Sequence, residues 1–127
     1  MPEAVVDASA VLRVLNGEPG AADVVGYLDG ALVSAVNYAE VVGKLVDVGM
    51  PPRFAADLCV PLRLQVVAFD DAQAVEAAAL RGVPRGRALS LGDRACLALA
   101  GLRSLPAVTA DAAWQNVDLG VDVIVAR

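Results

Sequence analysis

Histidine is absent from this 127-residue chain, and lysine occurs once, as Lys44. Without histidine, the chain has no Ser-His-Asp triad, no histidine-held metal site and no histidine general acid. The single lysine leaves one candidate for lysine-dependent phosphate chemistry. The two cysteines, Cys59 and Cys96, lie in apolar, helix-like stretches and form no CxxC motif. We therefore expect buried free thiols rather than a thiolate metal or redox site.

Long apolar runs are also missing. No stretch approaches the ~18 uninterrupted apolar residues of a membrane span. The N-terminus lacks the basic region, the long apolar core and the cleavage site of a secretory signal. We therefore expect a cytoplasmic protein that has no contact with a membrane.

Basic residues are fewer than acidic ones: 10 Lys and Arg against 15 Asp and Glu give a net charge of −5. A protein that holds duplex DNA through its phosphates is usually basic, so non-specific nucleic-acid binding is disfavoured. Acidity is still compatible with a nuclease, because bound divalent ions reverse the local field. The chain is 57% hydrophobic, although only 4% of its residues are aromatic. This composition predicts one sizeable core of close-packed aliphatic side chains.

Short apolar runs alternate with helical patterns along the chain. Strands are expected at residues 3–6, 31–35, 64–69, 106–110 and 121–126, and helices at residues 10–17, 20–30, 34–49, 50–60, 70–82, 90–105 and 111–116. Ser34 and Ser90 are expected N-caps, Pro61 is expected to end a helix, and residues 83–88 are expected to form a loop.

This alternation favours an α/β fold with a mostly parallel central sheet. The strands are near-continuous apolar runs, as strands covered on both faces of a sheet are. Because no repeat, linker or low-complexity segment interrupts the pattern, residues 1–127 are predicted to form one domain.

Four acidic residues fall at the ends of these elements or near their starts. Asp7 follows the first strand, and Asp111 follows the strand at 106–110. Glu40 lies on the helix after the second strand, and Asp93 lies at the start of the helix at 90–105. In an open α/β sheet, the carboxyl ends of the strands and the helix starts above them share the edge that holds the ligand crevice. We expect the four carboxylates to meet there.

Each acid also has a purely structural interpretation. Asp7 and Asp111 can cap the helices that follow them, and Asp93 can complete a capping box with Ser90. Glu40 can be an exposed helix residue. Together, however, carboxylates at the rim of an apolar core repel one another unless a cation joins them. Oxygen ligands without histidine or cysteine suit Mg²⁺ or Mn²⁺, and one or two such ions promote phosphodiester hydrolysis by orienting and acidifying a water.

Small polar residues accompany the acids. Ser9 follows Asp7 by two positions. Asn37 shares a helix face with Glu40, and Thr109 shares a strand face with Asp111. We expect these groups to orient the carboxylates or to bond to waters on the ions.

Four motifs, in this order and spacing, resemble a PIN domain and, more closely, a VapC toxin of a VapBC toxin–antitoxin module. They are VVDASAVL, SAVNYAEVVGKL, SLGDRACLALA and PAVTADAAW. The resemblance covers nearly the whole chain and implies a three-layer α/β/α fold and an endoribonuclease that depends on Mg²⁺ or Mn²⁺. By motif, it assigns the acidic positions and their polar supports to Asp7, Glu40, Asp93, Asp111, Ser9, Asn37 and Thr109. Trp114 matches an aromatic residue that often follows the last acid, and we expect it to anchor the core.

The resemblance also implies partners and a substrate. Such toxins usually form homodimers, and a VapB antitoxin wraps them into a heterotetramer or a larger assembly. The antitoxin blocks the site, often with an inserted basic side chain. The implied substrate is a structured RNA, often tRNA or rRNA, whose cleavage arrests translation.

A basic loop precedes the helix of Asp93 and contains Arg81, Arg85 and Arg87. One interpretation is that these arginines contact RNA phosphates beside the ions. The alternative is a solvated loop whose charges complement the end of the preceding helix.

Three other functional classes compete with the nuclease. A metal-dependent phosphatase of the haloacid dehalogenase type needs a second aspartate where Ser9 lies, and a lysine near the later acids, from which Lys44 is distant in sequence. A phosphate-accepting receiver domain is disfavoured because Asp70 and Asp71 follow the third strand rather than the first. The third class is a metal-binding interaction module that makes no catalytic use of its site.

Overall fold

The computed structural model describes residues 1–116 and 120–126 and contains a five-stranded parallel sheet. Its strands are β1 (Val5–Val6), β2 (Leu32–Ser34), β3 (Gln65–Val67), β4 (Ala107–Thr109) and β5 (Val123–Val125). The order across the sheet is β3-β2-β1-β4-β5. The chain therefore builds the sheet in one direction from β1 to β3, and then returns to the other side of β1 for β4 and β5.

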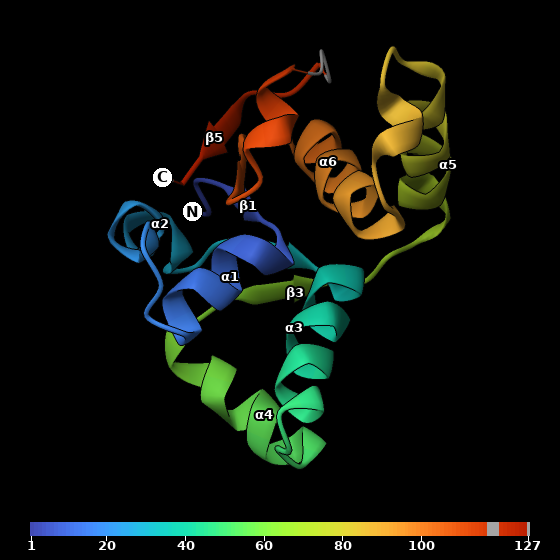
Figure 1. The fold of residues 1–127 in the computed structure, drawn as a ribbon. Helices are drawn as coiled ribbons and strands as arrows, with labels where there is room; N and C mark the ends of the chain where they lie inside the picture. Colours follow the sequence, from blue (N-terminus) through green and yellow to red (C-terminus); the bar gives the residue numbers. More distant parts are fainter. Residues whose placement is uncertain (117–119, 127) are drawn as a thin grey trace.

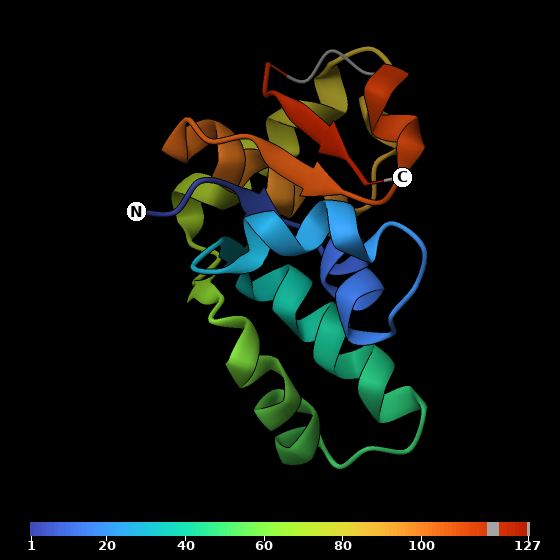
Figure 2. The ribbon, with the colours of Figure 1, turned by 90° about the vertical axis from the view of Figure 1, so that its left-hand side faces the viewer.

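Six α-helices connect these strands (Figures 1 and 2). They are α1 (Ala8–Leu15), α2 (Ala21–Leu28), α3 (Ala35–Asp47), α4 (Pro52–Cys59), α5 (Asp71–Ala79) and α6 (Leu91–Arg103). Four short 3₁₀ helices complete the described chain: η1 (Val60–Leu62), η2 (Leu80–Gly82), η3 (Gly86–Ala88) and η4 (Ala112–Asn116).

The helix starts follow from side-chain capping of free backbone N–H groups. Asp7 Oδ1 accepts from Ala10 N at the start of α1, and Ser34 Oγ accepts from Val36 N at the start of α3. At the start of α6, Ser90 forms a reciprocal capping box with Asp93. The predicted Ser34 and Ser90 caps are therefore confirmed.

The core lies on both faces of the sheet, because successive strand residues point to opposite sides. On one face, Val6 packs in a cluster that includes buried residues of α1, α2, α3 and α4. On the other face, Val5 packs with buried residues of α6 and with Trp114. Helix α5 covers the outer side of α6 (Figure 1). The layers are therefore helix, sheet and helix, as predicted.

A helical hairpin of α3 and α4 extends away from the sheet (Figure 2). Its connection contains Pro51 and Pro52, and Pro52 is the first residue of α4, where a missing N–H costs nothing. The hairpin matters for function because α3 starts at the carboxyl end of β2 and so brings its first turns to that edge.

The predicted fold class is confirmed, and the sheet is entirely parallel. Helix α4 ends at Cys59, and Pro61 lies in the following η1, so the chain keeps turning after the α-helix instead of leaving it at the proline. The predicted loop at 83–88 contains η3, and the predicted short helix after Asp111 is the 3₁₀ helix η4. Cys59 and Cys96 are buried free thiols, as predicted. None of the helices in the described part of the chain has the length and apolar character that a membrane crossing needs.

Candidate active site

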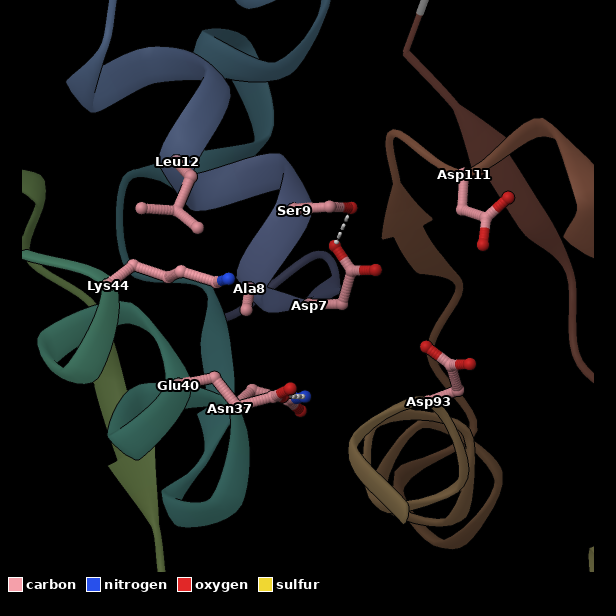
Figure 3. A pocket seen from close by; sticks show the side chains of 9 residues that line it. All are labelled: Asp7, Ala8, Ser9, Leu12, Asn37, Glu40, Lys44, Asp93 and Asp111. Carbon is pink, nitrogen blue, oxygen red and sulfur yellow. Dashed lines mark hydrogen bonds between the residues drawn. The ribbon is translucent and has the colours of Figure 1, made fainter. Parts of the chain in front are cut away.

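The return of the chain from β3 to β4 reverses the direction in which strands are added to the sheet, and this topological switch point lies between β1 and β4. Ligands of open α/β sheets bind at the carboxyl ends of the strands beside such a switch. Here a cavity of about 220 Å³ opens at that place (Figure 3). It is lined by Asp7, Ala8, Ser9, Leu12, Asn37, Glu40, Lys44, Asp93 and Asp111.

Four separate segments therefore bring their carboxylates to one cavity. Asp7 comes from the end of β1, Glu40 from α3, Asp93 from α6 and Asp111 from the turn after β4 (Figure 3). Ser9 and Asn37 line the same cavity, and Thr109 lies beneath it at the end of β4. The structure thus brings together the acidic and supporting residues named from the sequence, and their roles in catalysis remain a prediction.

Asp7 is held by three donors from two parts of the chain, the start of α1 and the end of β4. Its Oδ1 accepts from Ser9 Oγ (2.8 Å) and from Ala10 N (2.9 Å), and its Oδ2 accepts from Thr109 Oγ1 (2.6 Å). The Thr109 and Ser9 hydroxyls in turn accept from Asp111 N (3.0 Å) and Ala110 N (2.9 Å). This network ties the end of β1 to the end of β4, so the orientation of the Asp7 carboxylate is fixed before any ligand arrives.

Burial makes the charged form of Asp7 costly. The side chain is 4% exposed, and burial raises its pKa from 3.8 to about 6. The charge of Asp93 also raises this pKa, whereas the hydrogen bonds from Thr109, Ala10 N and Ser9 oppose the shift. A cation beside Asp7 would favour the ionised form.

The thiol of Cys96 lies beneath this group of acids. Burial raises the pKa of Cys96 well above its ordinary value, and the charges of Asp7, Asp93 and Glu40 contribute in that order. Cys96 is therefore an uncharged, buried thiol near the acids rather than a thiolate metal ligand.

Glu40 is positioned by α6 as well as by its own helix. Asn37 Nδ2 donates to Glu40 Oε1 (2.9 Å) and to the Gly92 carbonyl (2.9 Å). The Glu40 carboxylate lies directly over Gly92, because a Cβ at that glycine would be 2.8 Å from Glu40 Cδ and Oε2 and closer still to Oε1. Real Cβ atoms do not approach other atoms so closely, so a side chain at this position would displace the Glu40 carboxylate from its place against α6.

The other two acids are caps and cavity residues at the same time. Asp93 Oδ2 accepts from Ser90 N (2.9 Å) in the capping box of α6. Asp111 Oδ1 accepts from Ala113 N (2.9 Å) at the start of η4. Both acids nevertheless line the cavity. The two sequence interpretations, cap and site residue, therefore describe the same side chains.

The residues fit a divalent cation as an open, oxygen-lined site. Within residues 1–116 and 120–126, no three acidic or thiol side chains are already close enough together to hold one ion. Three features still suit a hard cation. The available ligand atoms are carboxylate, hydroxyl and amide oxygens, and the pKa of Asp7 is raised. In addition, Asn37 Oδ1 is buried without a hydrogen-bond partner among these residues. A buried orphan oxygen of this kind is satisfied by a water or an ion.

A second cavity of about 200 Å³ adjoins the first, because Asp93 and Asp111 line both. Its other lining residues include Arg85, Leu89 and Trp114. Arg81, Arg85 and Arg87 are all exposed, but Arg81 and Arg87 line neither cavity. Of the three arginines named from the sequence, the structure therefore places Arg85 next to the acids. Trp114 is 1% exposed and packs in the core, as expected.

Two residues of this region had no role in the cavity assigned from the sequence. Lys44, noted only as the one candidate for lysine-dependent phosphate chemistry, lines the same cavity as Asp93 and Asp111. Its position one helical turn after Glu40 indicates that the two side chains lie on the same face of α3. Gly92 precedes Asp93 in a helix, where a glycine is normally unfavourable, and that cost was the signal for a packing role.

Comparison with known proteins identifies the family. No curated protein matches the sequence. Among solved structures, the fold is similar to a toxin–antitoxin complex from Klebsiella pneumoniae (TM-score 0.75, 18% identity, 98% of each chain covered). It is also similar to DNA-bound VapBC from Salmonella typhimurium (0.74, 16%, 100% of each chain). A third similar structure is FitAcB from Neisseria gonorrhoeae (0.71, 20%, 95% of this chain and 96% of the other).

At these identities, the solved structures establish a shared fold. The sequence itself matches the PIN domain over residues 4–119, a range that contains the four acids. The chain belongs to the PIN domain family, whose members are nucleases.

Proposed function

We propose that residues 1–127 act as a single PIN domain that is an endoribonuclease toxin of a type II toxin–antitoxin system, dependent on Mg²⁺ or Mn²⁺. The observation that carries this proposal is the meeting of Asp7, Glu40, Asp93 and Asp111 at one cavity beside the topological switch point between β1 and β4. The family match and the likeness to toxin–antitoxin structures support it.

The four carboxylates would hold one or two divalent ions, directly or through water. When bound, such ions orient and acidify a water and offset the charge that develops on the phosphate oxygens. The donor set contains no histidine, so these hard oxygen ligands are the means by which the chain recruits that chemistry.

The remaining groups of the site keep these ligands in place. Thr109 and Ser9 hold the Asp7 carboxylate, and Asn37 holds that of Glu40. The free Asn37 Oδ1 would accept a hydrogen bond from a water in the cavity. The hydrogen bonds formed by the backbone N–H groups of Ala110 and Asp111 fix the turn that carries Asp111.

Arg85 is suited to binding the RNA backbone beside this site. It is exposed and shares a cavity with Asp93 and Asp111, so its guanidinium would reach a phosphate adjacent to the cleaved bond. Arg81 and Arg87 would contact the backbone farther away. The proposed substrate is a structured RNA such as tRNA or rRNA.

The proposed partner is a VapB-type antitoxin, in a heterotetramer or larger assembly built on a homodimer of this chain. The supporting observations are the net charge of −5 and the concentration of acids at one cavity, because a basic segment of a partner complements both. Such a segment would block access to the carboxylates.

The experiment compares RNA cleavage by the purified chain with that by Asp7→Asn and Asp93→Asn, in Mg²⁺, Mn²⁺ and EDTA. Asp47→Asn is the matched control, since it removes an exposed acid at the far end of α3. We expect cleavage by the unmodified chain and by the control, and a loss of at least about 100-fold in the two site variants. Full Mg²⁺-dependent activity in either site variant would refute the assignment.

The alternatives predict different outcomes in the same assays. A phosphatase would release phosphate from a phosphomonoester and leave RNA intact. A metal-binding interaction module would bind Mg²⁺ and cleave neither substrate. Induced expression followed by sequencing of new RNA 5′ ends would identify the RNA, and co-expression of a small neighbouring gene would test for the antitoxin.

A further inference from the structure

The cavity contains a side chain to which the proposed metal chemistry gives no role. Lys44 lies on α3 one turn after Glu40, and its side chain extends toward the cavity beside Leu12 and Ala8 of α1 (Figure 3). It is the only lysine of the chain. Its stem passes Leu12, and its ammonium extends into the cavity next to Ala8 (Figure 3), as a long amphipathic side chain favours.

The charge of this cavity makes a lone cation important. Of the nine residues that line it, four are acidic and Lys44 alone is basic. An RNA strand that enters such a cavity meets strong like-charge repulsion on each phosphate. Divalent ions offset this repulsion at the bond that is cleaved, but the neighbouring phosphates need their own positive partners.

Lys44 is available for this purpose. Although Glu40 lies one turn before it, no acidic oxygen lies within 4.0 Å of the Lys44 ammonium among residues 1–116 and 120–126. Glu40 instead accepts a hydrogen bond from Asn37 and lies over Gly92. The packing that orients Glu40 toward α6 therefore leaves the ammonium unpaired by this carboxylate.

Arg85 lines the adjoining cavity rather than that of Lys44. The two cavities share Asp93 and Asp111, and only that of Lys44 contains Asp7, Glu40 and the α1 residues Ala8, Ser9 and Leu12. The two cations therefore border the carboxylates from the α3 side and from the turn before η3. A strand that passes over the acids would meet a cation before and after them.

We propose that Lys44 binds a non-bridging oxygen of a backbone phosphate next to the cleaved bond, and that it acts in substrate binding rather than in metal binding. This inference rests on the proposed nuclease function. A charge-assisted bond to phosphate draws its strength from the ammonium, so arginine replaces lysine here and a neutral side chain does not.

The test uses Lys44→Gln and Lys44→Arg, with Arg103→Gln as the matched loss of one charge. Arg103 is exposed at the last residue of α6, so it lies about 15 Å along the helix from Asp93. Binding of a labelled single-stranded RNA is measured by fluorescence anisotropy in Ca²⁺, and steady-state cleavage is measured in saturating Mg²⁺, both at several NaCl concentrations. Affinity for Mg²⁺ is measured separately by calorimetry.

For Lys44→Gln we expect RNA affinity to fall and KM to rise by roughly five- to tenfold at low salt, because one phosphate contact is lost. The slope of log affinity against log salt falls by about 0.7. The kcat and the Mg²⁺ affinity stay within about twofold. Lys44→Arg restores RNA binding, and Arg103→Gln resembles the unmodified chain.

Three outcomes overturn parts of the interpretation separately. If the unmodified chain cleaves RNA and Lys44→Gln matches Arg103→Gln in binding, Lys44 has no phosphate role. A loss of Mg²⁺ affinity without a change in RNA binding also overturns the proposal, because Lys44 then acts on the metal site. If the chain binds RNA through Lys44 but never cleaves it, the nuclease function fails and the phosphate contact remains.

Discussion

Two halves of the site hold their carboxylates in different ways. In the Asp7 cluster (Asp7, Ser9 and Thr109), the carboxylate is buried and both of its oxygens are occupied by donors. In the Glu40 cluster (Asn37, Glu40 and Gly92), the carboxylate is exposed and only Oε1 accepts a hydrogen bond from the described residues. The Asp7 carboxylate is fixed by three hydrogen bonds in a buried, low-dielectric environment. The Glu40 carboxylate is held by one hydrogen bond and lies in the space that the missing side chain of Gly92 leaves open.

This difference separates two energetic tasks. Asp7 is costly to ionise but would need no reorganisation to bind a cation, so it would serve as the anchor of the proposed metal site. Glu40 is exposed, and one of its oxygens accepts no hydrogen bond from the described residues, so it would adjust to an ion in the proposed metal site. Variants of the Asp7 cluster should therefore change the pH dependence of stability, and variants of the Glu40 cluster should change Mg²⁺ affinity.

The largest effect is expected for Asp7→Asn in metal-free protein. The pKa of Asp7 is higher in the folded chain, at about 6, than the ordinary value of 3.8. Its contribution to stability is therefore complete below pH 3.8 and is lost as the pH rises through about 6. The difference corresponds to about 3 kcal/mol at pH 8.

Asparagine cannot ionise, so Asp7→Asn should be more stable than the unmodified chain at pH 8 and similar to it at pH 4. Urea unfolding in EDTA at both pH values measures this. Addition of Mg²⁺ should stabilise the unmodified chain and not the variant. Equal stability of the two proteins at pH 8 in EDTA would contradict the raised pKa.

The second effect concerns Gly92→Ala in the Glu40 cluster. The new methyl group occupies the space of the Glu40 carboxylate and displaces it. We expect Mg²⁺ affinity and cleavage to fall by roughly 10- to 100-fold, the usual cost of disturbing a group that orients a metal ligand. Calorimetry with Mg²⁺ and RNA cleavage measure these losses.

The control is Gly101→Ala in the same helix, where a Cβ would be 3.6 Å from Val121 Cγ2, an ordinary contact. This variant should retain activity. A double variant with Glu40→Ala distinguishes the steric clash from a general effect on the helix, because Gly92→Ala should cause no further loss of Mg²⁺ affinity once the Glu40 side chain is absent. A further loss in the double variant would contradict the steric explanation.

The smallest effect is expected for Thr109→Val in the Asp7 cluster. It removes the 2.6 Å hydrogen bond to Asp7 Oδ2 and the acceptor of Asp111 N. Unfolding free energy should fall by about 1–2 kcal/mol. Because this hydrogen bond lowers the pKa of Asp7, its loss should raise that pKa further. Carboxyl ¹³C NMR titration measures the shift, and Thr109→Ser, which keeps a hydroxyl, should largely preserve the pKa.

Much of the fold and of the candidate site could be predicted from the sequence. The alternation of apolar strands and helices predicted a parallel sheet covered on both faces, and this arrangement is confirmed. The order of Asp7, Glu40, Asp93 and Asp111 predicted that they meet, because parallel strands end at one edge. The place of Lys44 in the same cavity as Asp93 could not be predicted, because distance along the chain says nothing about which helices pack together.

What the sequence by itself determined is the chemistry available to this chain. The absence of histidine restricts the proposed site to oxygen ligands, and the capping residues Asp7, Ser34 and Ser90 set where helices begin. The ligand chemistry depends on residue identity alone, and the helix starts depend on hydrogen bonds between residues that are a few positions apart in the sequence.

Only the tertiary structure decided how the carboxylates differ from one another. Asp7 has a raised pKa because β1 is central in the sheet and α1, α6 and β4 exclude water around it. Glu40 remains exposed and turns toward α6 because α3 packs there against Gly92. Desolvation and steric fit arise from segments that are far apart in the sequence, so they exist only once the chain has folded.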